Sequence, residues 1–240
     1  MSLLKAIFFD IDDTLYSTTE FAEIARERAV EAMVRVGLNM RPADIKAELE
    51  EVVGEFSSNY EHHFDKLLQR ISRRYYKGIN PAVLITAAIV AYHDTKFREL
   101  KAYEDVIEVL RILTNTDLVL GVISAGVTNK QIEKLIRTGL LEFISPNAIF
   151  ISDQIGISKP NVKLYQRTCS DLNLKPPQTM YIGDNPANDI EPPKKIGMIT
   201  VWNKRAGKHL SAPPPVLPDY EISNFWDLID ILREDYQLEV

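Results

Sequence analysis

The chain has 240 residues, enough to bury a substantial apolar core in one large domain or in a core with a smaller insert. Its net charge of -6 provides no overall positive field, which argues against a nucleic-acid partner and against binding to an anionic membrane. A single cysteine, Cys169, rules out an intramolecular disulfide, and the longest apolar run, Ala82–Tyr92, is shorter than the roughly 20 residues of a membrane-spanning helix. We therefore predict a cytoplasmic protein.

The first predicted strand is the compact apolar run of residues 4–9, which is followed by Asp10, Asp12 and Asp13. From about residue 17 to about residue 97 the apolar residues recur with helical spacing instead. Four helices are predicted there: one that starts at Ser17, one that starts near Pro42, one from Tyr60 to Tyr75 and one that starts near Asn80. Four successive helices indicate a small helical module inserted after the first strand.

Helices and strands alternate after about residue 100. Strands are predicted at residues 118–124, 148–152, 179–184 and 198–202. Such alternation is typical of a parallel sheet with helices on both faces, and we expect the strand of residues 4–9 to join this sheet. The predicted fold class is therefore α/β: a doubly wound, Rossmann-like core of residues 1–16 and 97–240, with an inserted all-helical domain of residues 17–96.

Polar side chains follow four of the predicted strands, and the carboxyl ends of parallel strands are where such sheets bind ligands. These side chains are Asp10 and Asp12 after the first strand, Ser124 at the end of the second, Lys159 after the third, and Asp184 and Asp189 after the fourth. Residues i and i+2 of an extended chain point the same way, so Asp10 and Asp12 are able to face one site.

Converging carboxylates need a compensating positive charge. Two carboxylates about 4 Å apart repel by roughly 4 kcal/mol at an effective dielectric constant of about 20. The single lysine among these residues, Lys159, does not offset several such pairs. A Mg²⁺ ion does, because it prefers a few carboxylates together with water and a phosphate oxygen.

Four stretches of the chain resemble the signature motifs of the haloacid dehalogenase-like (HAD) superfamily and occur in the family's order. They are "DIDDTL" from Asp10, "VISAG" from Val122, "SKP" from Ser158 and "IGDNPANDI" from Ile182. The resemblance covers essentially the whole chain, because the helical insertion is similar to the C1-type cap of subfamily I. One departure is Ala125, which stands where asparagine is frequent in the second motif. The resemblance implies a hydrolase of the phosphatase-like branch.

The resemblance also implies catalytic roles. Asp10 is expected to be the nucleophile that forms an aspartyl-phosphate, and Asp12 to be the general acid and base. Ser124 and the backbone N–H of Ala125 are expected to bind the phosphoryl oxygens of the substrate. Lys159 is expected to stabilise the charge on both the nucleophile and the phosphoryl group.

A metal site is implied as well. Mg²⁺ is expected to bind the side chains of Asp10 and Asp184 and the backbone carbonyl of Asp12. Asp189 is expected to support this site by orienting a metal-bound water. The predicted activity is therefore Mg²⁺-dependent hydrolysis of a small-molecule phosphate monoester.

Three other functions remain open at this point. A 2-haloacid dehalogenase also uses an aspartate nucleophile, here Asp10, but the second acidic residue, Asp12, favours phosphoryl chemistry because that position is typically not acidic in the dehalogenases. A phosphomutase shares every catalytic role and differs only in the acceptor of the phosphoryl group. A receiver-like signalling module is a remote alternative, for which Asp153 is the candidate phosphoacceptor.

The sequence leaves the identity of the ester and the cap residues that select it undetermined. It also leaves the oligomeric state open, since the apolar run Ala82–Tyr92 fits the interior of the helical module or a contact between the subunits of a homo-oligomer.

Overall fold

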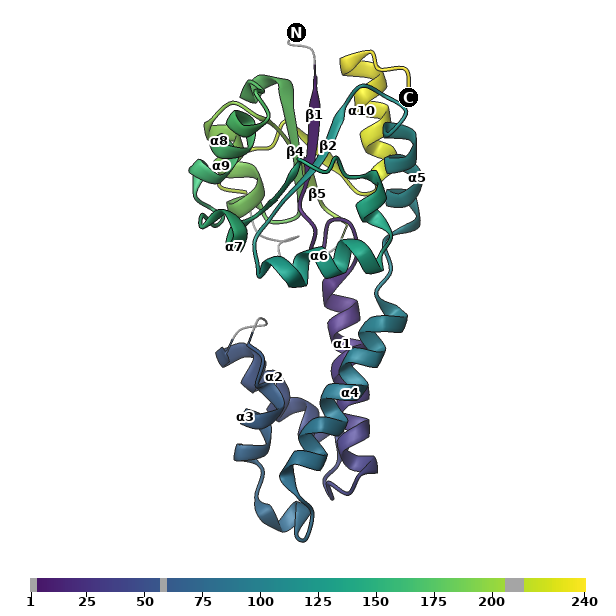
Figure 1. Ribbon diagram of the computed structural model, residues 1–240, viewed down its shortest axis with the longest axis vertical. Coiled ribbons are helices and arrows are strands. Elements are labelled where there is room, and N and C mark those ends of the chain that lie inside the picture. The colour runs from purple at the N-terminus through teal and green to yellow at the C-terminus, as the bar shows by residue number, and fades with distance from the viewer. Residues whose placement is uncertain (1–3, 57–59, 206–213) are drawn as a thin grey trace. The chain divides into compact units, whose positions relative to one another are not determined.

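The computed structural model describes residues 4–56, 60–205 and 214–240 (Figure 1). The chain forms two compact units, one made of residues 1–18 and 101–240 and the other of residues 19–100. Within the described ranges, no helix is long and apolar enough to cross a membrane. That the second unit acts as a cap stays a prediction.

The first unit is built around a six-stranded sheet in which every neighbouring pair of strands is parallel, in the order β3-β2-β1-β4-β5-β6. The strands are β1 (Ala6–Phe9), β2 (Val119–Ser124), β3 (Ile149–Ile151), β4 (Thr179–Gly183), β5 (Ile199–Asn203) and β6 (Tyr220–Ile222). The predicted α/β fold class is confirmed, and the five predicted strands end within two residues of the observed ones. The edge strand β6 was not predicted, because three residues are too few for a pattern.

Strand β1 lies at the centre of the sheet, between β2 and β4, and all four of its residues are fully buried. A strand that is apolar on both sides is what a parallel sheet covered on both faces requires. Phe8 belongs to the apolar cluster that includes Leu164 and Tyr165, whereas the ring of Phe9 stacks on that of Phe225 at a centroid distance of 5.8 Å. Alternate residues of β1 therefore anchor helices on opposite faces.

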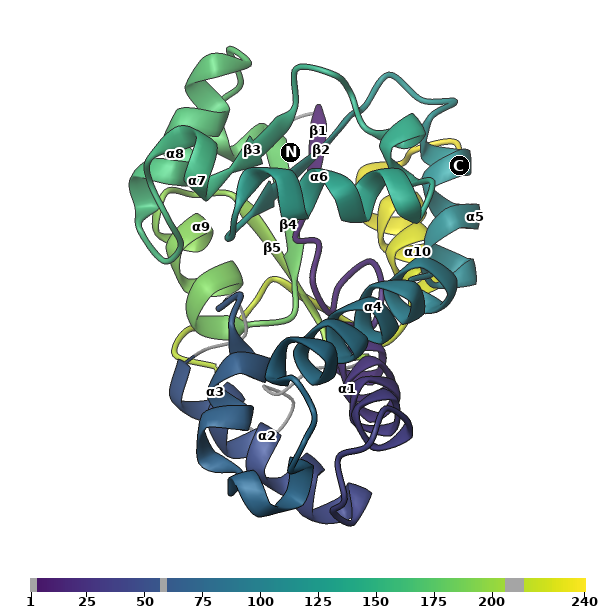
Figure 2. The same ribbon diagram turned by 60° about the horizontal axis from the view of Figure 1, so that its bottom comes forward.

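Helices cover both faces of the sheet, as Figure 2 shows. On one side lie α8 (Val162–Asp171) and α9 (Glu191–Lys195), and on the other lie α5 (Glu104–Leu113) and α10 (Phe225–Tyr236). The remaining helices of this unit are α6 (Thr128–Arg137), the single turn α7 (Ser152–Ile155), short 3₁₀ turns at Leu140–Phe143 and Pro176–Gln178, and a π-helical turn at Pro186–Ile190.

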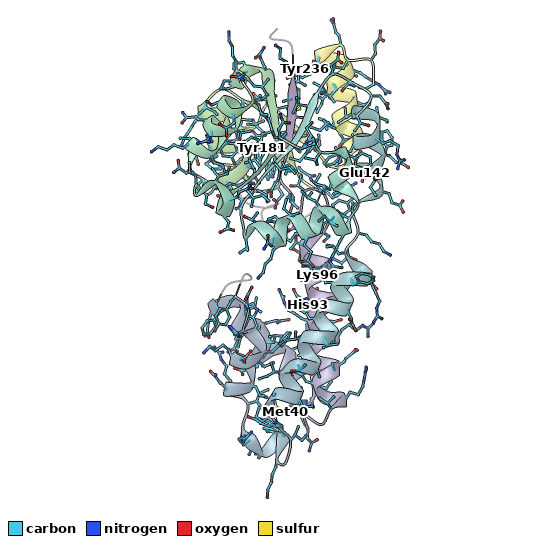
Figure 3. The ribbon with its side chains drawn as sticks, in the orientation of Figure 1. Met40, His93, Lys96, Glu142, Tyr181 and Tyr236 are labelled. Atoms are coloured by element: carbon cyan, nitrogen blue, oxygen red, sulfur yellow. The ribbon has the colours of Figure 1, made fainter. Side chains whose placement is uncertain are left out.

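The second unit contains the four-helix region that the sequence predicted. Its helices are α1, which starts at the border of the first unit (Thr18–Arg35), α2 (Pro42–Phe56), α3 (His63–Arg70) and α4 (Pro81–Glu99). They enclose a separate apolar core that includes Met33, Ile45, Leu67 and Leu84, and Met40 packs against it (Figure 3).

The predicted third helix from Tyr60 to Tyr75 is wrong in its bounds. Helix α3 ends at Arg70, and a separate 3₁₀ turn follows at Arg73–Tyr76. The interruption arises because the backbone of Ile71 and Ser72 is extended, with ψ values of 128° and 135°. Ile71 is only 6% exposed, so the break in the helix coincides with a residue buried in the core of the unit.

The strand order places a ligand-binding crevice at the middle of the sheet. The chain runs from β1 outward to β2 and β3, and then returns to β4 on the other side of β1. In doubly wound sheets, ligands bind where the order reverses in this way, beyond the carboxyl ends of the two central strands. Here these are the ends of β1 and β4, which lead directly into Asp10 and Asp184.

Candidate active site

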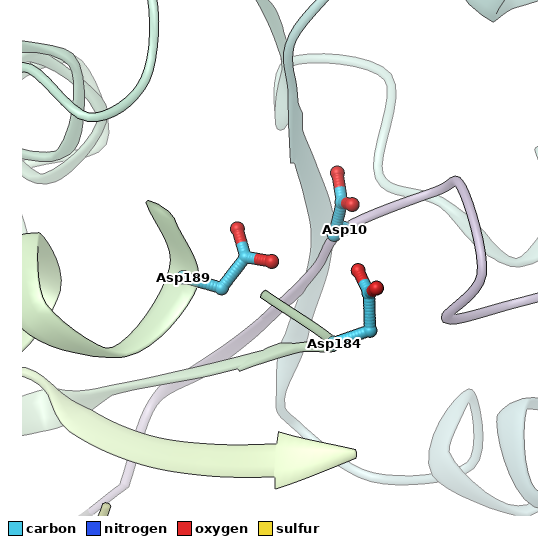
Figure 4. A group of neighbouring side chains, drawn as sticks. All are labelled: Asp10, Asp184 and Asp189. Carbon is cyan, nitrogen blue, oxygen red and sulfur yellow. The ribbon is translucent and has the colours of Figure 1, made fainter. Parts of the chain in front are cut away.

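Three buried aspartates come together at the carboxyl ends of β1 and β4. The backbone N–H of Asp10 donates to the carbonyl of Ile182 at 2.8 Å, which aligns the first residue after β1 with the end of β4. Carboxylate oxygens of Asp10, Asp184 and Asp189 all lie within 4.8 Å of one another, and Figure 4 shows the three side chains converging.

Asp189 reaches this group from the π-helical turn that follows β4. Its side chain occupies the space beside Gly183, where even a Cβ atom on that glycine would overlap it. Asp189 Oδ2 accepts from the backbone N–H of Asn185 at 3.0 Å, and Oδ1 accepts from the hydroxyl of Tyr181 at 3.2 Å. Tyr181, labelled in Figure 3, is itself buried on β4. Asp189 is therefore held by its own turn and by the sheet.

Lys159 forms ion pairs with two of the three carboxylates. Its ammonium lies 2.8 Å from Asp10 Oδ1 and 2.8 Å from Asp189 Oδ1, and its side chain is only 3% exposed. Burial by itself lowers the pKa of Lys159, but the carboxylates of Asp10 and Asp189 outweigh burial and raise the pKa above its ordinary value. The lysine therefore stays charged inside the site.

One lysine does not balance three carboxylates. Burial raises the pKa of Asp10 above its usual range despite Lys159, and burial together with Asp189 and Asp10 raises the pKa of Asp184 to about 8. Both shifts mean that the charged forms are unfavourable without a further cation. Three close, buried carboxylates with an excess of negative charge fit a hard divalent metal ion, which takes oxygen ligands.

The carboxylate of Asp12 lies in a different environment. Lys134 Nζ contacts Asp12 Oδ1 at 2.6 Å and Oδ2 at 2.9 Å, and Gln131 Nε2 donates to Oδ2 at 2.9 Å. Oδ1 also accepts from the hydroxyl of Tyr16 and from that of Thr18, the latter at 3.1 Å. Burial by itself raises the pKa of Asp12, but Lys134 and these hydrogen bonds outweigh it and hold the pKa below its ordinary value.

The prediction that Asp10 and Asp12 face one site was based on extended backbone, which this segment does not have. Strand β1 ends at Phe9, and the chain bends at Ile11, so the two residues are not part of one extended segment. The Asp10 carboxylate joins the metal-fitting cluster, and the Asp12 carboxylate turns to helix α6.

Ser124 and Ala125 lie at the same edge of the sheet, because β2 pairs with β1 in a register that sets Val122 beside Phe9. Ser124 is 1% exposed. The carbonyl of Ala125 accepts from Gln131 Nε2 at 2.7 Å, so one amide group connects this loop to Asp12. The next residue, Gly126, has a φ of +139°, a value that disfavours a side chain.

Asp153 does not join the cluster. Its Oδ2 accepts from the backbone N–H of Thr128 at 3.0 Å and from the hydroxyl of Thr128 at 2.8 Å. It therefore caps the first turn of α6 from α7, the helical turn that follows β3. Ser152 makes a parallel contact, since its Oγ accepts from the N–H of Gly126 at 2.9 Å. These contacts fix the loop that follows Ser124 and contains Ala125.

Sequence reasoning missed Lys134, Gln131 and Tyr16. Lys134 and Tyr16 carry no distinguishing signal, because a charged residue on an amphipathic helix is usually solvated and a tyrosine after a strand is usually core. Gln131 does carry one. It occupies the buried side of α6 together with Leu135, four residues on, where the helical pattern calls for an apolar residue.

Comparison with known proteins agrees with the motif analysis. The sequence profile of the family described as haloacid dehalogenase-like hydrolase matches residues 7–203. The chain is 41% identical to a glyceraldehyde 3-phosphate phosphatase of Methanopyrus kandleri, over 97% of this chain and 98% of the relative. It is 37% identical to a relative of the same name from Methanocaldococcus jannaschii, over 96% and 98%. Its fold is similar to that of the magnesium-bound HAD-hydrolase YfnB of Bacillus subtilis, with a TM-score of 0.68, 21% identity, and coverage of 96% and 99%.

Proposed function

This chain belongs to the haloacid dehalogenase-like hydrolases, and on that premise we propose that it is a Mg²⁺-dependent phosphatase that hydrolyses glyceraldehyde 3-phosphate. We infer the substrate from the end-to-end similarity to the phosphatase of Methanopyrus kandleri, which includes the helical unit as well as the core. The phosphate chemistry also fits the group of Asp10, Asp12, Ser124 and Lys159 at one edge of the sheet.

Asp10 is the nucleophile of the first step. Lys159 holds Asp10 Oδ1, which orients the carboxylate for attack on phosphorus. A bond forms between Asp10 and phosphorus, the bond from phosphorus to the ester oxygen breaks, and Asp12, in its protonated form, supplies a proton to the leaving oxygen. The products of this step are the free triose and an aspartyl-phosphate.

The second step returns the enzyme to its starting state. Asp12 accepts a proton from a water molecule, whose oxygen attacks phosphorus, and the bond to Asp10 breaks to release inorganic phosphate. Ser124 and the N–H of Ala125 bind phosphoryl oxygens during both steps, and Lys159 stabilises the negative charge that builds up around them. The buried position of Lys159 strengthens this effect, because few water molecules screen its charge.

Mg²⁺ fits the cluster because two of its carboxyl groups have raised pKa values, which a bound cation would relieve. The side chains of Asp10 and Asp184 and the backbone carbonyl of Asp12 would hold it, with Asp189 supporting them through its bonds to Lys159, Tyr181 and Asn185. When bound, Mg²⁺ neutralises negative charge on the nucleophile and on the phosphoryl group.

The helical unit serves as a cap in this proposal. The segments Tyr16–Thr19 and Asp94–Leu100 are the hinges that connect it to the core, and closure of the cap excludes water from the reaction. Residues on the cap would then select the triose part of the ester.

The test is release of inorganic phosphate from glyceraldehyde 3-phosphate, measured with Mg²⁺ and with EDTA. Glycerol 3-phosphate is the matched comparison, because it replaces only the aldehyde by an alcohol. We expect Mg²⁺-dependent release, faster with the aldehyde, and without any sugar bisphosphate, which a phosphomutase would need. Halide release from a 2-haloacid that survives EDTA, or no phosphate release from any of these esters, would contradict the proposal.

A further inference from the structure

The carboxylate of Asp12 accepts hydrogen bonds from four side chains. Lys134 contacts both of its oxygens, Gln131 donates to Oδ2, and the hydroxyls of Tyr16 and Thr18 donate to Oδ1. A carboxylate offers about four lone-pair positions. The side chain of Asp12 is 29% exposed, so an ester oxygen that approaches it has to compete with these donors for the carboxylate oxygens.

The donors differ in their freedom to leave. Gln131 is 2% exposed and also bonds the carbonyl of Ala125, so its amide is fixed on two sides. Tyr16 is likewise 2% exposed. The side chain of Lys134 is 18% exposed and carries its ammonium on a flexible four-carbon stem. Of the two nitrogen donors, Lys134 is thus the one that can leave Asp12 with the smaller disturbance.

An arriving ester offers Lys134 a new partner. An ester oxygen in hydrogen-bond contact with Asp12 would lie no more than about 6 Å from the Lys134 ammonium, because two ordinary hydrogen bonds in series connect them. The ester is a dianion, and Lys159 is already bound to Asp10 and Asp189. Lys134 is the more exposed of these two lysines and can turn to the ester.

We propose that Lys134 is a substrate-binding residue that exchanges partners during the reaction: it pairs with Asp12 in the free protein and with oxygens of the phosphate ester in the complex. The exchange binds the substrate and at the same time frees oxygens of Asp12 to contact the ester. This inference rests on the proposed phosphatase function and adds a residue that lies outside the four signature motifs.

The first experiment is steady-state kinetics of Lys134→Gln with glyceraldehyde 3-phosphate and Mg²⁺. A lost charge-assisted hydrogen bond to substrate raises KM about tenfold or more. We expect kcat to change less, because Asp12 no longer has to be released. Lys134→Arg keeps the charge and is expected to restore most of the affinity. Lys163→Gln, an exposed lysine on α8, is the matched control and is expected to leave both constants unchanged.

The second experiment tests the exchange directly in protein whose turnover is strongly reduced. Asp12→Asn removes the charge that competes with the ester for Lys134, so calorimetry should show tighter binding of glyceraldehyde 3-phosphate than the KM of the wild type indicates. In the double variant Asp12→Asn, Lys134→Gln this gain should disappear, which a double-mutant cycle would record as coupling between the two residues.

The outcomes separate the two proposals. If the wild type releases no phosphate from the ester, the proposed function fails. If the wild type is active but Lys134→Gln lowers kcat at unchanged KM, or behaves like the wild type, then only the partner exchange is overturned. Thermal unfolding of each variant shows whether it is folded before its kinetics are interpreted.

Discussion

Asp10 and Asp12 are separated by one residue, yet their carboxylates lie in opposite electrostatic environments. Asp10 shares Lys159 with Asp189 and lies beside Asp184, and burial raises its pKa. Asp12 has an ammonium group across both oxygens, and its pKa is lowered although it is partly buried. Burial acts in the same direction on both groups, so the difference comes from their neighbours.

The two carboxylates belong to one sequence motif, but their different environments suit them to two different tasks. A cluster with too much negative charge is suited to hold a cation and to present a nucleophile beside it. A carboxylate whose charge is balanced by a movable lysine is suited to be released when substrate arrives. Substitutions at Asp10, Asp12 and Asp184 test this division.

Asp10→Asn should abolish phosphatase activity, with a loss of roughly 10³-fold or more, because the amide oxygen does not form the covalent intermediate. The measurement is phosphate release at saturating substrate and Mg²⁺, together with thermal unfolding to show that the variant is folded. Activity within about tenfold of the wild type would mean that another group attacks phosphorus.

Asp12→Asn should lower kcat by roughly 10²- to 10⁴-fold, the usual range for loss of a general acid and base. Binding of Mg²⁺ should remain close to that of the wild type, because the Asp12 carboxylate is bonded to α6 and not to the cluster. Titration calorimetry with Mg²⁺ checks the second part. A large loss of Mg²⁺ affinity would contradict the division between the two carboxylates.

Asp184→Asn should remove most of the stabilisation by Mg²⁺. A ligand at about 100 times its Kd stabilises the folded state by about 2.7 kcal/mol, and this gain requires the ligands that hold the ion. The shift of Tm on addition of Mg²⁺ measures it for the wild type and for Asp184→Asn. Equal shifts in the two proteins would show that the ion binds elsewhere.

Asp105 provides a charge-balanced carboxylate outside the site. Arg205 contacts both of its oxygens at 2.7 and 2.6 Å, and the N–H of Phe225 donates to it at 2.8 Å. Burial by itself raises the pKa of Asp105, but these bonds outweigh burial and hold the pKa below its ordinary value. Its contribution to stability is therefore present above the unfolded pKa and is lost as the pH falls through the folded pKa.

Asp105→Asn should consequently reduce the free energy of unfolding by about 1–3 kcal/mol at neutral pH, which is a few degrees in Tm. The difference from the wild type should shrink in acid, below the ordinary pKa of an aspartate. Thermal unfolding at neutral and at acid pH measures both. A difference that stays constant across this range would show that the ion pair is not its cause. Phosphatase activity at neutral pH should be unchanged.

Much of the molecule follows from sequence patterns. The apolar run before Asp10 predicts a central strand because only a strand covered on both faces tolerates four consecutive buried residues. The alternation of helices and strands predicts the α/β fold class, and the four motifs at strand ends predict the family; both are confirmed. The phosphatase chemistry that the motifs predict agrees with the names of the relatives. The motifs also predict that Asp10, Lys159 and Asp184 lie together, since parallel strands end at one edge of a sheet. The catalytic roles of these residues stay predictions.

Tertiary structure decides what surrounds each of these groups. The sequence spacing predicts the same orientation for Asp10 and Asp12. In the folded chain, the bend at Ile11 and the position of α6 bring the Asp12 carboxylate to Gln131 and Lys134, more than 100 positions away along the chain. The local hydrophobic pattern of the sequence predicts which side chains a strand or helix buries, because the buried positions recur with the period of the backbone. The charge that a carboxylate carries depends on distances to groups from other elements, and only the folded chain sets those distances.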